Sequence, residues 1–139
     1  MIAIRDTLGN HRSPVSEDEL KALIEFSSDG FWTQGSGDLA IKIDENGLTK
    51  SMVIVKKPGF GFMLNIFDGG DQMIAVSSMD YEQTTVTSIG GEPWEVPVAF
   101  FIDPKRALGA VIHFYREGGQ TGEIEWVDFY EQSWTNKLS

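Results

Sequence analysis

The side chains most often used for catalysis and metal binding are scarce in this sequence and follow no recognisable motif. The 139 residues include two histidines and no cysteine. His11 lies in a polar segment, and His113 lies on a predicted helix, opposite its apolar face. Zinc sites use His or Cys ligands at short, regular spacing, and neither histidine has such a partner nearby in the sequence. The sequence therefore predicts no catalytic residue, no metal site and no cofactor.

Carboxylates are abundant, but none is singled out for chemistry. The segment Asp68-Gly69-Gly70-Asp71 has the oxygen ligands that a cation loop needs at its start. It lacks the further ligands and the distal Glu of an EF-hand loop, so a tight hairpin turn explains it more simply. An acid–base pair needs two carboxylates held together, and no spacing here predicts one. We therefore expect a binding protein rather than an enzyme.

The distribution of charge is more informative than its total. The formal net charge is −10, and no Lys or Arg lies between Lys57 and Lys105. Such a field repels phosphate backbones and anionic membranes and attracts basic proteins, so we expect neither direct nucleic-acid binding nor membrane binding. Solubility alone is the alternative explanation of an acidic chain, although surfaces of mixed sign are the usual solution for solubility. The acids of the cation-free stretch are Asp68, Asp71, Asp80, Glu82, Glu92, Glu95 and Asp103.

Six residues of this stretch are the predicted contacts with a partner. Trp94 lies in Gly90-Gly-Glu-Pro-Trp-Glu95, a turn-like segment with acidic neighbours. A Trp among carboxylates on a loop can anchor a protein interface, and it can equally cap the core. The predicted binding residues are Asp68, Asp71, Asp80, Glu82, Glu92 and Trp94, on the assumption that they fold into one negative surface.

Two helix starts frame the predicted fold. Ser16 stands three residues before Glu19, a capping box that predicts a helix over Ser16–Ser27, ended by Asp29-Gly30. Asp103-Pro104 combines a preferred N-cap with a preferred first helical residue, and Gly118-Gly119 ends the second helix. Its predicted apolar face contains Ala107, Leu108, Val111, Ile112 and Tyr115, with Phe114 near the margin.

Short apolar segments between turn residues predict the strands. They cover residues 1–5, 38–44, 51–55, 61–67, 72–77, 84–89, 96–102 and 123–127, and Pro97 restricts the 96–102 segment to a sheet edge or to its first residues. Glu45-Asn46-Gly47 is a hairpin signal. We therefore expect a single α+β domain over 1–139, with a mainly antiparallel curved sheet of about five to seven strands and two helices packed on one face.

A helix, a glycine break and a short strand ending in Ile-x-Trp follow one another near the end of the chain. The residues are Asp103-Pro104, Ala107, Ala110 and Phe114, then Gly118-Gly119, then Ile124-Glu125-Trp126. With the hairpin-rich middle, this order resembles immunity-protein family one of bacterial polymorphic toxin systems, over residues 37–128. That family includes inhibitors of secreted nucleic-acid deaminase toxins. The resemblance implies a cytoplasmic protein that binds one cognate toxin and blocks its active site, and it transfers no catalytic or toxin-contacting residue.

Charge and resemblance lead to the same functional hypothesis. Toxins that attack nucleic acid need basic clefts to hold phosphates, and an acidic protein can occupy such a cleft. The expected partner is a basic toxin encoded nearby. The N-terminus has no apolar run of signal-peptide length, which favours the cytoplasm. One alternative is an enzyme or a small-ligand-binding α+β domain, with a pocket inside the curved sheet and buried carboxylates of raised pKa. The other is a non-catalytic regulatory or interaction domain.

Overall fold

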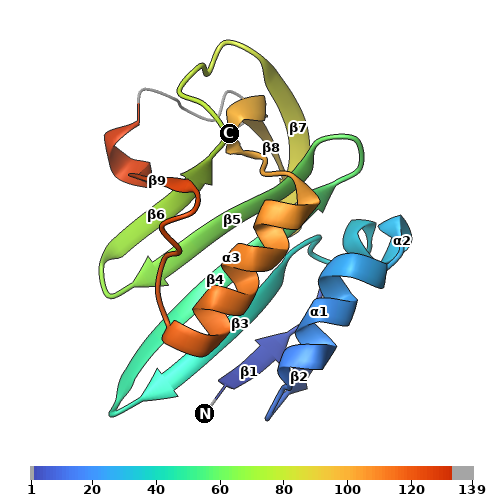
Figure 1. Ribbon diagram of the computed structural model, residues 1–139. Helices are drawn as coiled ribbons and strands as arrows, with labels where there is room; N and C mark the ends of the chain where they lie inside the picture. Colours follow the sequence, from blue (N-terminus) through green and yellow to red (C-terminus); the bar gives the residue numbers. More distant parts are fainter. Residues whose placement is uncertain (1, 133–139) are drawn as a thin grey trace.

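The computed structural model describes residues 2–132 of the chain (Figure 1). It contains the α-helices α1 (Glu17–Phe26), α2 (Asp29–Thr33) and α3 (Pro104–Glu117) and the 3-10 helices η1 (Val98–Phe100) and η2 (Phe129–Glu131). The strands are β1 (Ile2–Arg5), β2 (His11–Arg12), β3 (Leu39–Glu45), β4 (Leu48–Lys57), β5 (Gly61–Asp68), β6 (Asp71–Val76), β7 (Thr84–Ile89), β8 (Glu92–Pro97) and β9 (Glu125–Asp128).

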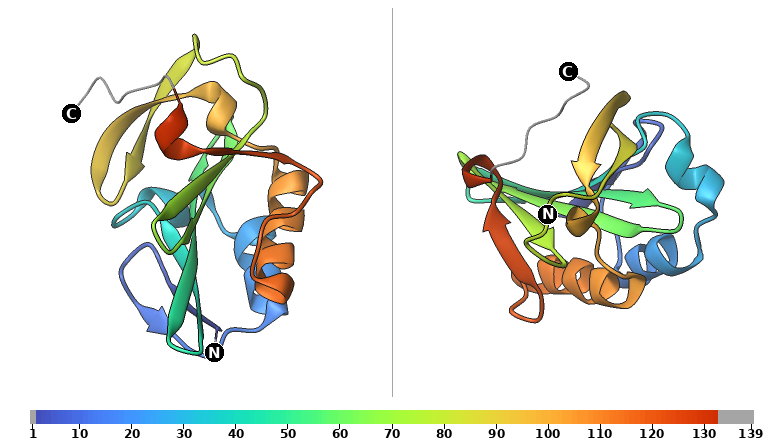
Figure 2. Two further views of the ribbon diagram at one scale, coloured as in Figure 1. Left: turned by 90° about the vertical axis from the view of Figure 1, so that its left-hand side faces the viewer. Right: turned by 90° about the horizontal axis from the view of Figure 1, so that it is seen from above.

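The strands form one large antiparallel sheet and a separate hairpin. The large sheet has seven strands in the order β2-β1-β3-β4-β5-β6-β9, and β7 pairs with β8 alone. Figure 2 (left) shows α1 and α3 on one side of the large sheet and the β7–β8 hairpin on the other. The predicted α+β class with a mainly antiparallel sheet is therefore confirmed. We call the two sides of the sheet the helix face and the back face.

Alternation along the strands divides the core into two layers. Phe62, Leu64 and Ile66 of β5 join the helix-face core together with α1 and α3. Met63, the neighbour of Phe62, joins a back-face core with Phe100 of η1. Because successive side chains on a strand point to opposite faces, one apolar strand can supply both cores. This explains why the sequence of β5 is apolar almost throughout.

The first helix begins as its sequence predicts. The Ser16 hydroxyl accepts a hydrogen bond from the Glu19 amide at 3.1 Å. The Glu19 carboxylate accepts a hydrogen bond from the Ser16 hydroxyl rather than from the Ser16 amide. The return hydrogen bond of this capping box therefore joins two side chains. Val15 and Leu20, on either side of this cap, are both buried in the helix-face core as the hydrophobic staple requires.

The helix ends where it was predicted to, with Ser27 as its C-cap, but the predicted terminator is wrong. Helix α1 ends at Phe26, and Asp29-Gly30 starts the short helix α2 instead of stopping α1. Ser28 is the reason, because its side chain caps α2 by accepting from the Phe31 amide. Trp32 then anchors α2 in the core, edge-on to Phe62 at a centroid distance of 5.6 Å. The fold thus has three α-helices among its described residues, not two.

Helix α3 keeps its predicted ends, and its buried face includes Ala107 and Val111 as predicted but is shifted towards Ala110 and Phe114. Asp103 caps its start through the Arg106 amide, and Gly118 ends it with a φ of 73°. Phe114 is fully buried in the helix-face core, whereas Leu108 and Tyr115 are only partly buried. The sequence-based placement of Phe114 at the margin of the apolar face is therefore wrong.

The predicted strand over 96–102 is also wrong. Strand β8 ends at Pro97, and residues 98–100 form η1. Pro97 has no N–H with which to extend a ladder, and the next aromatic pair, Phe100 and Phe101, is buried in the back-face core. Ile102, just before α3, then forms a bridge with Phe62 of the large sheet.

An exposed ion pair ties α1 to α3 and should make stability depend on pH. The Arg116 guanidinium donates to both carboxylate oxygens of Glu17, at 2.5 and 2.9 Å. This hydrogen bond, with the charges of Arg116 and Lys21, lowers the pKa of Glu17 below its usual value. A carboxyl group whose pKa is lowered by folding stabilises the protein above its unfolded pKa, and this contribution is lost as the pH falls through the lowered pKa.

We therefore expect Glu17→Gln to reduce the urea midpoint at neutral pH and to match the unmodified protein in acid. Glu25→Gln on the same helix is the control, since Glu25 is exposed and forms no ion pair with a described residue. Equal midpoints for Glu17→Gln and Glu25→Gln at neutral pH would show that the Glu17–Arg116 pair contributes nothing.

Candidate binding surface and pocket

The net negative charge of the protein lies in one part of the fold. Residues 58–102 and 118–132 contain ten acids and no Lys or Arg. The rest of the sequence contains eleven acids and eleven Lys and Arg residues, so it is formally neutral. We call the first part, which comprises β5, β6, β7, β8, β9, η1 and η2, the cation-free half. Figure 1 shows it as the upper and left-hand part of the molecule, without α3.

Ion pairs from the neutral part leave this separation almost intact. Of the seven ion pairs defined between described residues, only Lys50–Asp68 reaches an acid of the cation-free half, at 3.8 Å. The Lys50 ammonium also donates to the carbonyl oxygen of Gly118, so it is shared. In each of the other six pairs, both the acid and the cation belong to the neutral part. These pairs therefore do not reduce the negative charge of the cation-free half.

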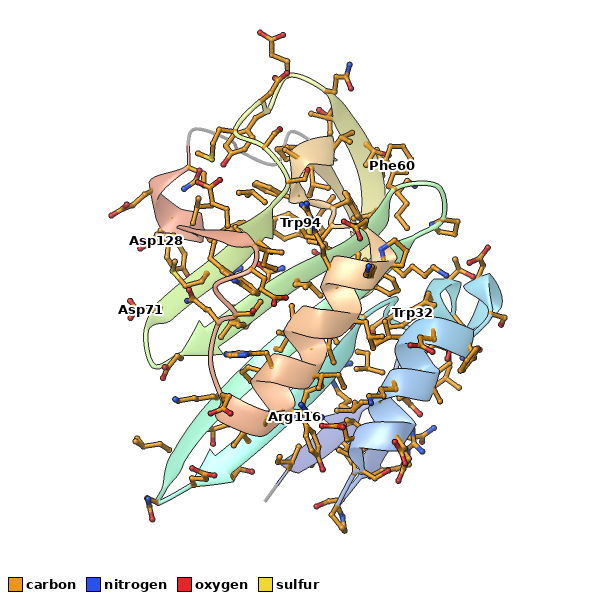
Figure 3. All side chains as sticks on the ribbon, viewed as in Figure 1. Trp32, Phe60, Asp71, Trp94, Arg116 and Asp128 are labelled. Carbon is orange, nitrogen blue, oxygen red and sulfur yellow. The ribbon has the colours of Figure 1, made fainter. Side chains whose placement is uncertain are left out.

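Three acids of the cation-free half share one face of three neighbouring strands. Asp68 of β5 and Asp71 of β6 face each other across the Gly69-Gly70 turn, which confirms the hairpin interpretation of this segment. Asp128 of β9 stands opposite Met73, two residues along β6 from Asp71. Side chains directly opposite or two residues apart lie on the same face, so these three carboxylates gather on the helix face. Asp71 and Asp128 lie at the same edge of the molecule in Figure 3.

The other predicted contact acids lie elsewhere. Asp80 and Glu82 follow the far end of β6, where the Asp80 carboxylate accepts from the Glu82 amide. Glu92 starts β8 at the tip of the β7–β8 hairpin, where the Gly91 amide donates to the Ser36 carbonyl at 3.0 Å. The six predicted contacts therefore do not form one compact surface, although all of them belong to the cation-free half.

Trp94 is part of a strand and not of a loop. It lies in β8, half-buried, and packs with Val96 and Ile89 against the back-face core. The Gly90-Gly91 turn ends before it, at residues whose φ values of 61° and 85° suit glycine. Of the two roles considered for Trp94, packing against the core is the one that the structure shows. Figure 3 places it towards the middle of the molecule, away from Asp71 and Asp128.

An apolar pocket opens between the back face and the β7–β8 hairpin. Its volume is about 250 Å³, and no residue that lines it is charged. Nine of the ten lining residues belong to the cation-free half. These nine come from five separate elements, so the sequence could not reveal the pocket. The lining residues are Val53, Met63, Asn65, Phe67, Gln72, Ile74, Ile89, Trp94, Val96 and Phe129. We call this cavity the back-face pocket.

Two amides provide the polar part of this pocket. Asn65 is 7% exposed, and its carbonyl oxygen accepts from the Gln72 amide nitrogen at 3.0 Å. Both side chains point to the back face, between the apolar neighbours Met63 and Phe67 on β5 and beside Ile74 on β6. A buried amide within an apolar strand is a detectable sequence signal, since Asn65 interrupts the otherwise apolar segment GFMLNIF.

Tyr81 connects the loop after β6 to the end of the described chain. Its hydroxyl donates to the Gln132 side-chain oxygen, and its ring packs edge-on against Phe100. Burial and, to a smaller extent, the negative charge of Glu125 raise the pKa of Tyr81 above its usual value. The hydroxyl therefore remains protonated and available to this hydrogen bond over the ordinary pH range.

Neither histidine lines the back-face pocket. His11 is exposed on the short edge strand β2, and His113 is half-buried on α3. Within residues 2–132, no group of three or more His, Asp or Glu side chains is placed to hold a metal ion. None of the helices in the described part of the chain is long and apolar enough to cross a membrane.

The sequence matches no protein-family model, and no curated protein is similar to it. The resemblance to the immunity proteins therefore stays a prediction.

Proposed function

We propose that this protein binds a basic protein partner through its cation-free half, and that the partner is a nucleic-acid-targeting toxin whose active site it blocks. In this proposal the protein is an immunity protein that acts in the cytoplasm and performs no catalysis of its own. The residues proposed to face the toxin are Asp71 and Asp128 first, with Asp68, Asp80, Glu82 and Glu92 extending the field around them.

The segregation of charge is the observation that supports this proposal. A formally neutral part joined to a part with ten acids and no cation gives the molecule a directed field. Such a field accelerates encounters with a basic partner and orients the acidic side towards it. Solubility alone requires net charge but not its confinement to one part of the fold.

Small-ligand binding is the second candidate, and the back-face pocket favours it. The form of this hypothesis that relied on buried carboxylates is not supported, since no carboxylate lines the pocket. A ligand of this pocket would therefore be recognised without charge.

The protein encoded beside this chain's gene tests the proposed function. We expect that protein to arrest growth when it is produced alone in bacteria and to be harmless when it is co-produced with this chain. The two purified proteins should form a 1:1 complex that weakens as salt is added, because ions screen exposed charges. A neighbouring protein that is neither toxic nor bound would contradict the proposal.

A further inference from the structure

We propose that the back-face pocket binds an uncharged aromatic molecule whose single polar group hydrogen-bonds to Asn65 and Gln72. This inference does not depend on a toxin partner. The pocket opens on the back face of the sheet, whereas Asp68, Asp71 and Asp128 lie on the helix face.

The lining of the pocket determines the charge and the shape of its ligand. The pocket has a volume of about 250 Å³, and its wall contains no charged residue. A charged ligand would lose its hydration there without gaining a counter-ion, so the occupant must be neutral. Phe67, Trp94 and Phe129 supply ring surfaces from three different elements, and aromatic rings pack well against such walls.

The two amides leave hydrogen-bonding capacity that no group within residues 2–132 uses. Asn65 and Gln72 share one hydrogen bond and form no other side-chain hydrogen bond with the residues that the structure describes. The pair therefore retains a free N–H₂ group on Asn65 and a free carbonyl oxygen on Gln72. Exchanging oxygen and nitrogen in both amides leaves one free donor group and one free acceptor as before, so the pair offers a ligand the same two groups in either orientation.

The free amide nitrogen of Asn65 is accessible from the pocket. Within the described chain, the Trp32 indole nitrogen is the one side-chain polar atom that is sealed from solvent without a partner. Asn65 is nine-tenths buried and lines the pocket, so its unpaired nitrogen is open to the pocket space rather than enclosed in the core.

Placing the Asn65 amide in an apolar wall would cost folding free energy if the wall served only to pack the core. Met63 and Phe67 flank Asn65 on the back face, and an apolar side chain between them would avoid burying an incompletely paired amide. Polar groups placed singly in an apolar pocket are the usual means of orienting a ligand. A hydroxyl group can accept from Asn65 and donate to Gln72 at once, so a phenol-like ring compound fits both free groups.

A matched pair of probes tests the inference on the full chain. The probe 2-naphthol carries the hydroxyl, and 2-methylnaphthalene has nearly the same shape without it. We expect 2-naphthol to bind about tenfold more tightly, as two modest neutral hydrogen bonds predict. Binding should shift the side-chain amide signals of Asn65 and Gln72 in ¹⁵N-resolved NMR spectra.

Substitutions then separate recognition from mere hydrophobic uptake. Asn65→Leu should remove the preference for 2-naphthol, and Gln72→Leu should do the same if Asn65→Leu fails to fold. Gln83→Leu removes an exposed amide of the same half outside the pocket and should leave the preference unchanged. The inference is overturned if 2-naphthol does not bind, if the shifted signals lie away from the pocket, or if both Leu variants in the pocket keep the preference.

Discussion

Replacing Phe114 by alanine is expected to lower the free energy of unfolding by about 3–5 kcal/mol. Phe114 has no exposed surface and lies where α3 meets the helix-face core of the sheet. Removal of its ring loses the transfer free energy of the buried atoms and leaves a cavity that the surrounding side chains cannot fill completely. For a protein of this size, this is a large part of a total stability of roughly 5–15 kcal/mol.

Urea denaturation followed by circular dichroism measures this change. The control is Phe26→Ala, because Phe26 is 79% exposed at the end of α1 and should change the stability by less than about 0.5 kcal/mol. A small effect of Phe114→Ala would mean that α3 does not pack on the sheet through this residue, and the described core would then be incorrect.

Gly61→Ala is the second substitution with a large expected effect. Gly61 starts β5 with a φ of 112°, and a Cβ atom there would lie 2.3 Å from the Ile102 carbonyl oxygen. That oxygen accepts the hydrogen bond from the Phe62 amide which joins the segment before α3 to the sheet. We expect a loss of about 3 kcal/mol or more, since backbone strain and a clash with a fixed carbonyl add together.

The neighbouring glycine isolates the steric part of this effect. Gly59 also has a positive φ, 86°, but a Cβ atom there meets nothing within 4 Å. Gly59→Ala should therefore cost only the strain of the left-handed conformation, about 1 kcal/mol. Equal urea midpoints for the two variants would contradict the close approach of Ile102 to β5.

Local signals in the sequence predicted local structure well. Ser16 and Asp103 cap their helices, and the Asn46-Gly47 and Gly69-Gly70 turns join neighbouring strands. Each of these features depends on residues that are only a few positions apart, so the chain itself brings the interacting groups together. The same reasoning missed α2, because the Ser28 cap was not weighed against Gly30 as a terminator.

Features that depend on distant pairing could not be predicted. Strand β9 pairs with β6 across about fifty residues of intervening chain, and this pairing brings Asp128 beside Met73. Nothing in the local sequence of either strand specifies that partner. The same holds for the β7–β8 hairpin, whose packing on the back face creates the pocket and separates Glu92 from Asp71.

One part of the charge distribution could be predicted from the sequence, and another part could not. The cation-free stretch between Lys57 and Lys105 was visible in the sequence, and it folds largely into one half of the molecule. The sequence did not show that residues 118–132 would join that half through β9. It also could not show that Asp80 and Glu82 would lie at the opposite end of β6 from Asp71.

The association rate with the neighbouring gene's product is the most direct test of the claim that the cation-free half receives a basic toxin. Asp71→Lys with Glu92→Lys should slow association about tenfold at low salt, since the steering field is reversed at two of its positions. Asp18→Lys with Glu25→Lys makes the same change of net charge on the exposed side of α1 and should slow it far less. Equal rates for the two double variants would contradict the account, because net charge rather than its position would then govern the encounter.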